Sequence, residues 1–212
     1  MSINFSQQES PPIILASTSP RRQELLTMLQ VPFQVIAPTV DENRYDHLMS
    51  EPQQYVELLA KLKGESVAKD YPNHLVIGSD TTVYLDKKDP DKGSKKMTLG
   101  KPTSIKDAEA MLSDLQNNTH TVFSAIAVSY QHQTKTASLA TQVRFCPMSP
   151  AEIKAYVATG EPMDKAGSYA IQGIGGQYIH SIDGCYFNVM GMSVRLLREL
   201  FETLGFNLNA VR

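Results

Sequence analysis

Short apolar runs recur along the chain, and segments with helical periodicity lie between them. The apolar runs predict strands at residues 13–16, 75–77, 83–85, 122–128 and 143–145. After Gly78 and after Thr119 the strands look paired, as in hairpins or meanders. Because helices and strands alternate elsewhere, the pattern predicts an α/β fold whose sheet is mixed and not purely parallel.

Capping signals mark the expected helix starts. They are Ser19 with Pro20 at the first helical position, the capping boxes Ser50-Glu51-Pro52-Gln53 and Ser149-Pro150-Ala151-Glu152, and Ser104. Gly160 should end the helix that Ser149 begins, and a last helix is expected over residues 193–204. The expected buried positions are Val56, Leu59, Leu62, Val67, Ala108, Met111, Leu112, Leu115, Leu196, Leu197, Leu200 and Leu204.

One stretch shows neither the apolar runs of strands nor the periodicity of helices. Residues 87–98 (KKDPDKGSKKMT) are rich in lysine, aspartate and glycine and contain a proline. This composition predicts a mobile surface loop. Its five lysines could attract nucleotides, but a solvated loop is the favoured interpretation.

Length and charge limit the function classes. With 212 residues, the chain can form one α/β domain or two small lobes. A formal net charge of −2 provides no basic field for nucleic acid. The polar tail at residues 1–10 lacks the pattern of a signal peptide, and no apolar run reaches membrane length. We therefore expect a soluble, cytoplasmic protein.

The cysteines and histidines indicate no metal centre. Cys146 and Cys185 form neither a disulfide framework nor a metal-ligand spacing, so two idle thiols in a reducing cytosol are expected. The five histidines are scattered along the chain, and each is interpreted as structural or exposed.

The segment from Leu15 to Leu26 is the first candidate for chemistry. A strand-like run ends in small hydroxyl residues, and a helix with Pro20, Arg21 and Arg22 in its first turn follows. Free backbone N–H groups beside two fixed positive charges favour an anion, and the interpretation we prefer is a phosphate. An ordinary capped helix with two solvated arginines is the alternative.

Carboxylates after apolar runs are the second candidate. Asp80 follows the run at residues 75–77 and is expected at the end of that strand, where open α/β sheets bind ligands. Burial there could raise its pKa toward that of a general base. Asp41 and Glu42 end another apolar stretch. Carboxylates that converge on a phosphate site usually hold Mg²⁺ or Mn²⁺, but the spacing leaves their convergence open.

Lysines supply further charge, while several familiar motifs are missing. Lys63, Lys101 and Lys165 could join the two arginines in a polyphosphate site, although each alone is more often a surface residue. The chain has no GxxxxGK[ST] sequence, and the glycine-rich residues 173–176 lack the strand–turn–helix frame of a dinucleotide fingerprint.

Several motifs occur together in a familiar order. They are LASTSPRRQELL, GSDTT, LGKP, EPMDKAGSYAIQG and IDGCYFNVMG, spread over residues 13–204. In this the chain resembles the Maf family of nucleotide pyrophosphatases. The resemblance implies an elongated α/β fold with a mixed sheet and a central cleft between two lobes, similar to inosine triphosphate pyrophosphatases, with the whole chain as a single domain. It also implies hydrolysis of a nucleoside triphosphate to the monophosphate and pyrophosphate, with a divalent cation.

The resemblance assigns roles to individual residues. The catalytic aspartate falls on Asp80, and the metal-binding carboxylates on Glu42 and Asp80. Phosphate-handling positions fall on Ser17, Arg22, Lys63 and Lys101. The branch that hydrolyses dTTP and UTP has Arg, Thr and Gln where this chain has Arg21, Thr81 and Gln172. An amide can donate and accept, so Gln172 could read a uracil or thymine edge.

Other functions stay open at this stage. The related branch that acts on 7-methyl-GTP tends to have an aromatic residue in place of Arg21 and a glutamine after the aspartate. A nucleotide-binding regulator of cell division and a nucleic-acid-binding protein are the remaining alternatives, and the net charge argues against the latter. The substrate could include modified pyrimidine nucleotides, as in a house-cleaning enzyme. The protein could act as a monomer or a homodimer.

Two features depart from the family pattern. The segment at residues 87–98 is longer than the expected turn and could alter access to the cleft. Met192-Ser193 replaces a common Leu-Pro pair, which should affect the start of the last helix and not the chemistry.

Overall fold

The computed structural model describes residues 11–89 and 93–211 and contains a mixed seven-stranded sheet in that part of the chain. The polar tail predicted at residues 1–10 lies outside the described residues. The strands are β1 (Ile13–Ala16), β2 (Phe33–Val35), β3 (Leu75–Asp89), β4 (Gly93–Leu99), β5 (Thr119–Tyr130), β6 (Gln133–Phe145) and β7 (Ile179–Asp183). Their order is β2-β1-β3-β5-β6-β7, with β4 paired to β3. Among the described strands, β1 pairs in parallel with β2 and β3 and the other pairs are antiparallel, so the prediction of a mixed sheet is confirmed.

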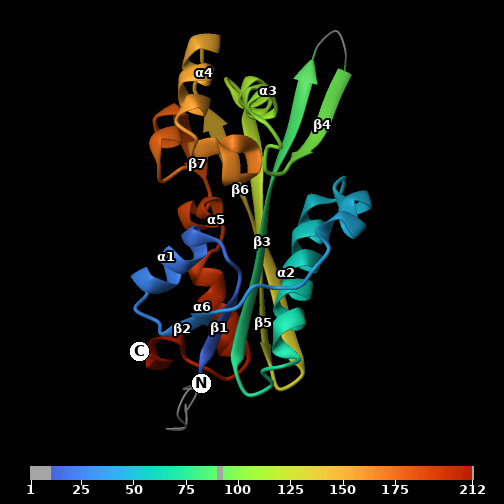
Figure 1. Ribbon diagram of the computed structural model, residues 1–212, viewed down its shortest axis with the longest axis vertical. Helices are drawn as coiled ribbons and strands as arrows, with labels where there is room; N and C mark the ends of the chain where they lie inside the picture. Colours follow the sequence, from blue (N-terminus) through green and yellow to red (C-terminus); the bar gives the residue numbers. More distant parts are fainter. Residues whose placement is uncertain (1–10, 90–92, 212) are drawn as a thin grey trace.

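Helices cover both faces of the sheet (Figure 1). The α-helices are α1 (Pro20–Met28), α2 (Pro52–Ala68), α3 (Ile105–Leu115), α4 (Pro150–Ala158), α5 (Tyr186–Met190) and α6 (Val194–Thr203). The 3₁₀ turns are η1 (Glu42–Leu48), η2 (Glu161–Asp164), η3 (Ala166–Ser168), η4 (Ile174–Tyr178) and η5 (Leu208–Val211). None of the helices in the described chain is long and apolar enough to cross a membrane.

Alternation along the long strands divides the apolar core. On β5, Ile126 and Val128 pack in a cluster with α1 and α6, whereas Ala125 and Ala127 face α2. Val122, nearer the start of β5, belongs to a separate cluster with α3 and α4. Two cores therefore lie at different heights along an elongated sheet, with β3, β5 and β6 running from one toward the other (Figure 1).

The predicted strands at residues 75–77 and 83–85 are in fact one continuous strand, β3. Its polar centre, from Ser79 to Thr82, pairs with β5 without interruption. Asp80 therefore lies inside a strand, and the prediction that it ends one is wrong. The neighbouring strand β1 does end close to Asp80: the last pair of its parallel ladder with β3 joins Ala16 and Gly78. Beyond the end of β1, Asp80, Thr81 and Thr82 of β3 line a cleft, although Asp80 and Thr82 are themselves buried.

The segment at residues 87–98 was expected to be a loop, and this prediction is also wrong for its described part. β3 and β4 form a hairpin in which Lys87 pairs with Lys95. Both ammonium groups contact the Asp114 carboxylate on α3, at 3.1 and 3.3 Å, which offsets their mutual repulsion. Residues 90–92 lie outside the described residues.

The side-chain capping predictions are confirmed for α3 and α4 but not for α1 and α2. Ser149 and Glu152 form the expected capping box, and the Ser104 hydroxyl accepts from the backbone N–H of Asp107. The box predicted at Ser50 is absent in the described structure, because Glu51 occupies the N-cap of α2 and makes no side-chain capping bond. Ser19 is the N-cap of α1, but its side chain makes no capping bond either.

Two glycines bring α2 against the sheet. A Cβ atom on Gly78 would lie 2.2 Å from the carbonyl oxygen of Ala60, and one on Gly64 would contact the backbone of Gly78. Only glycine at position 78 permits this approach of helix to strand. The close packing places Lys63 of α2 beside Asp80 of β3.

Candidate active site

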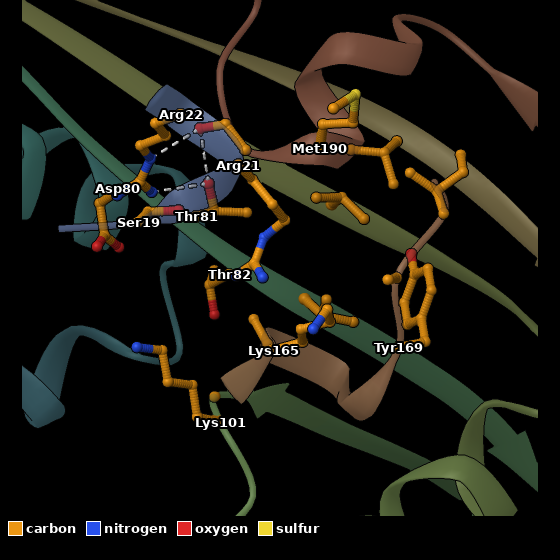
Figure 2. A pocket seen from close by; sticks show the side chains of 18 of the residues that line it. Ser19, Arg21, Arg22, Asp80, Thr81, Thr82, Lys101, Lys165, Tyr169 and Met190 are labelled. Carbon is orange, nitrogen blue, oxygen red and sulfur yellow. Dashed lines mark hydrogen bonds between the residues drawn. The ribbon is translucent and has the colours of Figure 1, made fainter. Parts of the chain in front are cut away.

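A cleft of about 340 Å³ opens where β1 ends. Its walls come from the first turn of α1, the polar centre of β3, the β4–α3 connection and the segments at residues 165–172 and 189–191 (Figure 2). The residues predicted from sequence that line it are Arg21, Arg22, Glu42, Lys63, Asp80, Thr81, Lys101 and Gln172. Ser17 is not among the lining residues of the described chain, but it contacts Arg22.

Asp80, Lys63 and Glu42 form the acidic end of the cleft. The Nζ atom of Lys63 lies 2.5 Å from Oδ1 of Asp80 and 2.9 Å from Oε1 of Glu42. Lys63 is 8% exposed and Asp80 is 7% exposed, whereas Glu42 is half open to solvent. The two carboxylates therefore both bind the ammonium group of Lys63.

Burial dominates the electrostatics of the aspartate. Desolvation raises the pKa of the Asp80 carboxyl, against the opposing effects of the Lys63 and Arg22 charges. Tyr55 of α2 also lines this end, and burial with the nearby Asp80 and Glu42 charges raises its pKa to about 12. A carboxylate with a raised pKa, held near two cations, has the character of a general base.

Arg22 is held by groups from three parts of the chain, and Figure 2 shows its contact with one of them, Thr81. Its Nε donates to the carbonyl of Gly191 at 3.2 Å, and its terminal nitrogens donate to the hydroxyls of Ser17 at 3.0 Å and Thr81 at 3.2 Å. Burial lowers its pKa, and the Asp80 charge opposes that shift. The Thr81 hydroxyl also bonds to Ser124 at 2.7 Å. This network ties α1, β3 and the segment after α5 together beside the cleft.

Arg21 crosses the cleft in a different direction. Its guanidinium donates to the Asp164 carboxylate and to the Asp164 carbonyl, each at 3.3 Å. The Lys165 ammonium contacts the other Asp164 oxygen at 2.6 Å and the carbonyl of Glu161 at 2.7 Å. Arg21 and the exposed Gln172 line the cleft and define its loop end, and Asp164 holds Arg21 there.

Lys101 and Gln172 keep their polar groups available. Within the described residues, neither side chain makes a hydrogen bond, although both line the cleft. Figure 2 shows Lys101 extending from the β4–α3 connection toward the side where Asp80 lies. Gly100, next to it, is fixed because its carbonyl accepts from the backbone N–H of Gly167 at 3.0 Å.

Sequence reasoning missed several lining residues. Tyr55, Thr82, Tyr169 and Met190 were not assigned, and Lys165 was noted only as an available cation. Tyr169 is buried, and its hydroxyl is joined to Nε2 of the buried His120 at 2.8 Å. Its place inside the EPMDKAGSYAIQG motif was the only signal available.

The donor set agrees in part with a divalent cation. Among the described residues, no three His, Cys, Asp or Glu side chains cluster as a complete metal site. Glu42 and Asp80 nevertheless lie on either side of the Lys63 ammonium, so a divalent cation would bind their other oxygens or take the place of that ammonium. Hard cations take oxygen ligands and can complete their shell from water and a bound phosphate. The two carboxylates therefore fit a metal that arrives with its substrate.

The chain is thus an α/β protein with a mixed sheet and an open cleft that combines a buried carboxylate with several cations. The sequence model of the family described as Maf-like protein matches residues 12–204, so the chain belongs to that family.

Curated relatives cover nearly the whole chain. It is 44% identical over 188 residues to a dTTP/UTP pyrophosphatase of Gloeobacter violaceus, covering 89% of this chain and 93% of the relative. It is also 44% identical to a dTTP/UTP pyrophosphatase of Desulforamulus reducens, covering 92% and 97%. A third relative with the same name, from Shewanella oneidensis, is 41% identical and covers 91% and 98%.

Proposed function

We propose that this chain hydrolyses dTTP and UTP to the monophosphate and pyrophosphate. The observation that carries the proposal is the buried Asp80 carboxylate, which lies between cations in the same cleft as Arg21, Thr81 and Gln172. Similarity to relatives named dTTP/UTP pyrophosphatase over nine-tenths of the chain supports the same activity. Residues 1–212 are proposed to form a single domain with two lobes around this cleft.

Asp80 is the proposed catalytic base. Its raised pKa lets it accept a proton at a carboxylate oxygen from a water molecule that attacks the α-phosphorus. Lys63 holds Oδ1 of that carboxylate in place, which leaves Oδ2 to accept the proton. Its ammonium then remains close enough to stabilise negative charge on the phosphates.

Glu42 and Asp80 would hold the divalent cation, Mg²⁺ or Mn²⁺. When bound, such a cation neutralises charge on the triphosphate and on the leaving pyrophosphate. Glu42 is the better placed ligand, because its carboxylate is half exposed and bonds only to Lys63 among the described residues. Asp80 can then keep a lone pair for the proton.

The remaining cations would bind the phosphates. Lys101 has no partner among the described residues, and its ammonium is free to meet a phosphate oxygen. Arg22 retains further N–H donors beyond those used by Ser17, Thr81 and Gly191. Ser17 would act by holding Arg22, and through it the charge of the first turn of α1.

Arg21, Thr81 and Gln172 would select the base. Gln172 can donate to O4 and accept from N3–H of uracil or thymine, a pattern that purines do not present in the same place. Leaving such polar groups unpaired with a wrong base lowers its binding.

A nucleotide panel tests the function directly. Pyrophosphate release should be measured for dTTP, UTP, CTP, purine triphosphates, modified pyrimidine nucleotides and 7-methyl-GTP, each with Mg²⁺ and with Mn²⁺. We expect dTTP and UTP to give the largest kcat/KM values. A preference for 7-methyl-GTP would assign the chain to the related branch, and nucleotide binding without hydrolysis would indicate a regulator. Sedimentation velocity on the same sample distinguishes a monomer from a homodimer.

A further inference from the structure

The glycine-rich turn at residues 173–176 follows Gln172 directly, and a single carboxylate holds it. Oε2 of Glu161 accepts from the backbone N–H of Ile174 at 2.9 Å. Oε1 of the same carboxylate accepts from the backbone N–H of Gly175 at 2.9 Å and from the Tyr156 hydroxyl at 2.7 Å. Glu161 opens η2 and is not among the described residues that line the cleft.

Tyr156 secures the other side of Gln172. Its side chain is 1% exposed, and its hydroxyl accepts from the backbone N–H of Ala170 at 3.2 Å while donating to Glu161. The segment is thus fixed at Ala170, before Gln172, and at Ile174, after it. One tyrosine–glutamate pair makes all of these contacts.

The glycines in the turn allow this close contact. A Cβ atom on Gly173 would lie 2.2 Å from a Glu161 carboxylate oxygen, and one on Gly175 would lie 2.3 Å from the Tyr156 hydroxyl. Side chains at these positions would displace the pair. The glycine-rich sequence therefore serves the approach of Glu161 and Tyr156.

The three donors around the Glu161 carboxylate favour its charged form. Partial burial acts to raise the pKa of Glu161, but the hydrogen bonds from Gly175, Tyr156 and Ile174 outweigh it, and the pKa is lowered. Hydrogen bonds to an ionised acceptor are stronger than neutral ones. The turn is therefore firmly held.

We infer that Glu161, supported by Tyr156, is a positioning residue for base recognition, which fixes the backbone around Gln172 so that its amide meets the pyrimidine. Ala170, Ile171 and Gln172 all line the cleft. The Gln172 side chain has no hydrogen-bond partner among the described residues, so its backbone sets where the amide can reach. This inference rests on the proposed function.

The test compares Glu161→Gln with the wild type and with Gln172→Ala. Steady-state kcat and KM are measured for dTTP, UTP and the purine triphosphate that the wild type hydrolyses fastest. We expect Glu161→Gln to lower kcat/KM for dTTP and UTP by about tenfold, mainly through KM, because loosening the turn weakens one polar contact to the base. The loss for the purine nucleotide should be smaller.

The double variant Glu161→Gln/Gln172→Ala decides whether Glu161 acts through Gln172. In the Gln172→Ala background, Glu161→Gln should have no further effect on the ratio of pyrimidine to purine kcat/KM. An undiminished effect in that background, an equal loss for every nucleotide, or no change in the single variant would each overturn the inference.

Glu152→Gln is the matched control. Glu152 also accepts from a backbone N–H, that of Ser149, but it lies in the capping box of α4. Glu152→Gln should change thermal stability and leave the ratio of pyrimidine to purine kcat/KM unchanged. If Glu161→Gln does not fold, Tyr156→Phe should shift the ratio in the same direction, and an unchanged ratio there counts against the inference. A wild type inactive on dTTP and UTP would instead overturn the proposed function itself.

Discussion

The two ends of the cleft hold their side chains in different ways. At the acidic end, Asp80 and Lys63 are buried and bond directly to each other. At the loop end, the Gln172 side chain is exposed and makes no hydrogen bond among the described residues. Glu161 holds the backbone that follows it, through the N–H groups of Ile174 and Gly175. Proton transfer needs a fixed, desolvated group, whereas base selection needs a polar group that is still unpaired when the ligand arrives. The cleft provides each in a separate place.

The largest effect should come from Asp80→Asn. The amide keeps the size of the side chain but cannot accept the proton, so we expect kcat to fall by about 10²–10⁴. Pyrophosphate release with UTP measures it, and circular dichroism checks the fold. Asp86→Asn, on the same strand but exposed, is the control and should keep full activity. Near-normal turnover by Asp80→Asn would remove the chemical role of the acidic end.

Arg22→Lys should have the next largest effect. A lysine cannot reach Ser17, Thr81 and Gly191 together, since an ammonium lacks the planar fork of a guanidinium. We expect kcat/KM for UTP to fall by about tenfold or more, the cost of charged hydrogen bonds lost beside the substrate. Arg44→Lys, on the exposed turn η1, should change nothing. If both variants match the wild type, the Arg22 network is structural only.

Glu42→Gln tests the metal at the acidic end. A neutral amide oxygen is a weaker ligand for a hard cation, so the Mg²⁺ concentration for half-maximal activity should rise several-fold. Titration of activity with Mg²⁺ at fixed UTP measures it. Asp46→Asn, on the same turn but outside the cleft lining, should leave the titration unchanged. An unchanged midpoint for Glu42→Gln would show that its carboxylate does not hold the cation.

The smallest effect concerns the pH dependence of stability at His120, which bonds to the cleft-lining Tyr169. Burial lowers the pKa of His120 to about 3, well below that of an unfolded histidine. Its contribution to stability is therefore complete above about pH 6.5 and is lost as the pH falls toward 3, at about 1 kcal/mol per pH unit. Denaturant unfolding of His120→Gln between pH 7 and 5 should lack this slope. His132→Gln, in the exposed β5–β6 turn, should retain it, and identical slopes in all three proteins would contradict the assignment.

Much of the fold followed from local signals. Ser149 with Glu152 and Ser104 fixed two helix starts, because capping depends on residues close in sequence. Local patterns failed to predict secondary structure where residues distant in the sequence stabilise it. Asp114 stabilises lysine-rich strands that read as a loop, and pairing with β5 carries β3 through the polar residues from Ser79 to Thr82.

The candidate site shows the same limit. Every site residue predicted from motifs lines the cleft except Ser17, but the prediction missed other lining residues such as Tyr55 and Tyr169. The sequence could not show that Lys63 lies between Glu42 and Asp80, because this depends on the approach of α2 at Gly78. It could not show the role of Glu161 either, since its partners are backbone groups that carry no residue-specific signal.

Because β3 continues without a break through Asp80, the segment before Asp80 cannot gain or lose one residue without changing the site. Successive side chains of a strand face opposite ways, so Asp80 meets Lys63 on one face while Ser79 and Thr81 meet the Gly191 carbonyl on the other. Inserting or deleting one codon between Leu75 and Asp80 would exchange these faces and separate the aspartate from its lysine. Single substitutions away from Gly78 and Asp80 leave this alternation intact, but a single-residue insertion or deletion would abolish activity even if the protein still folded.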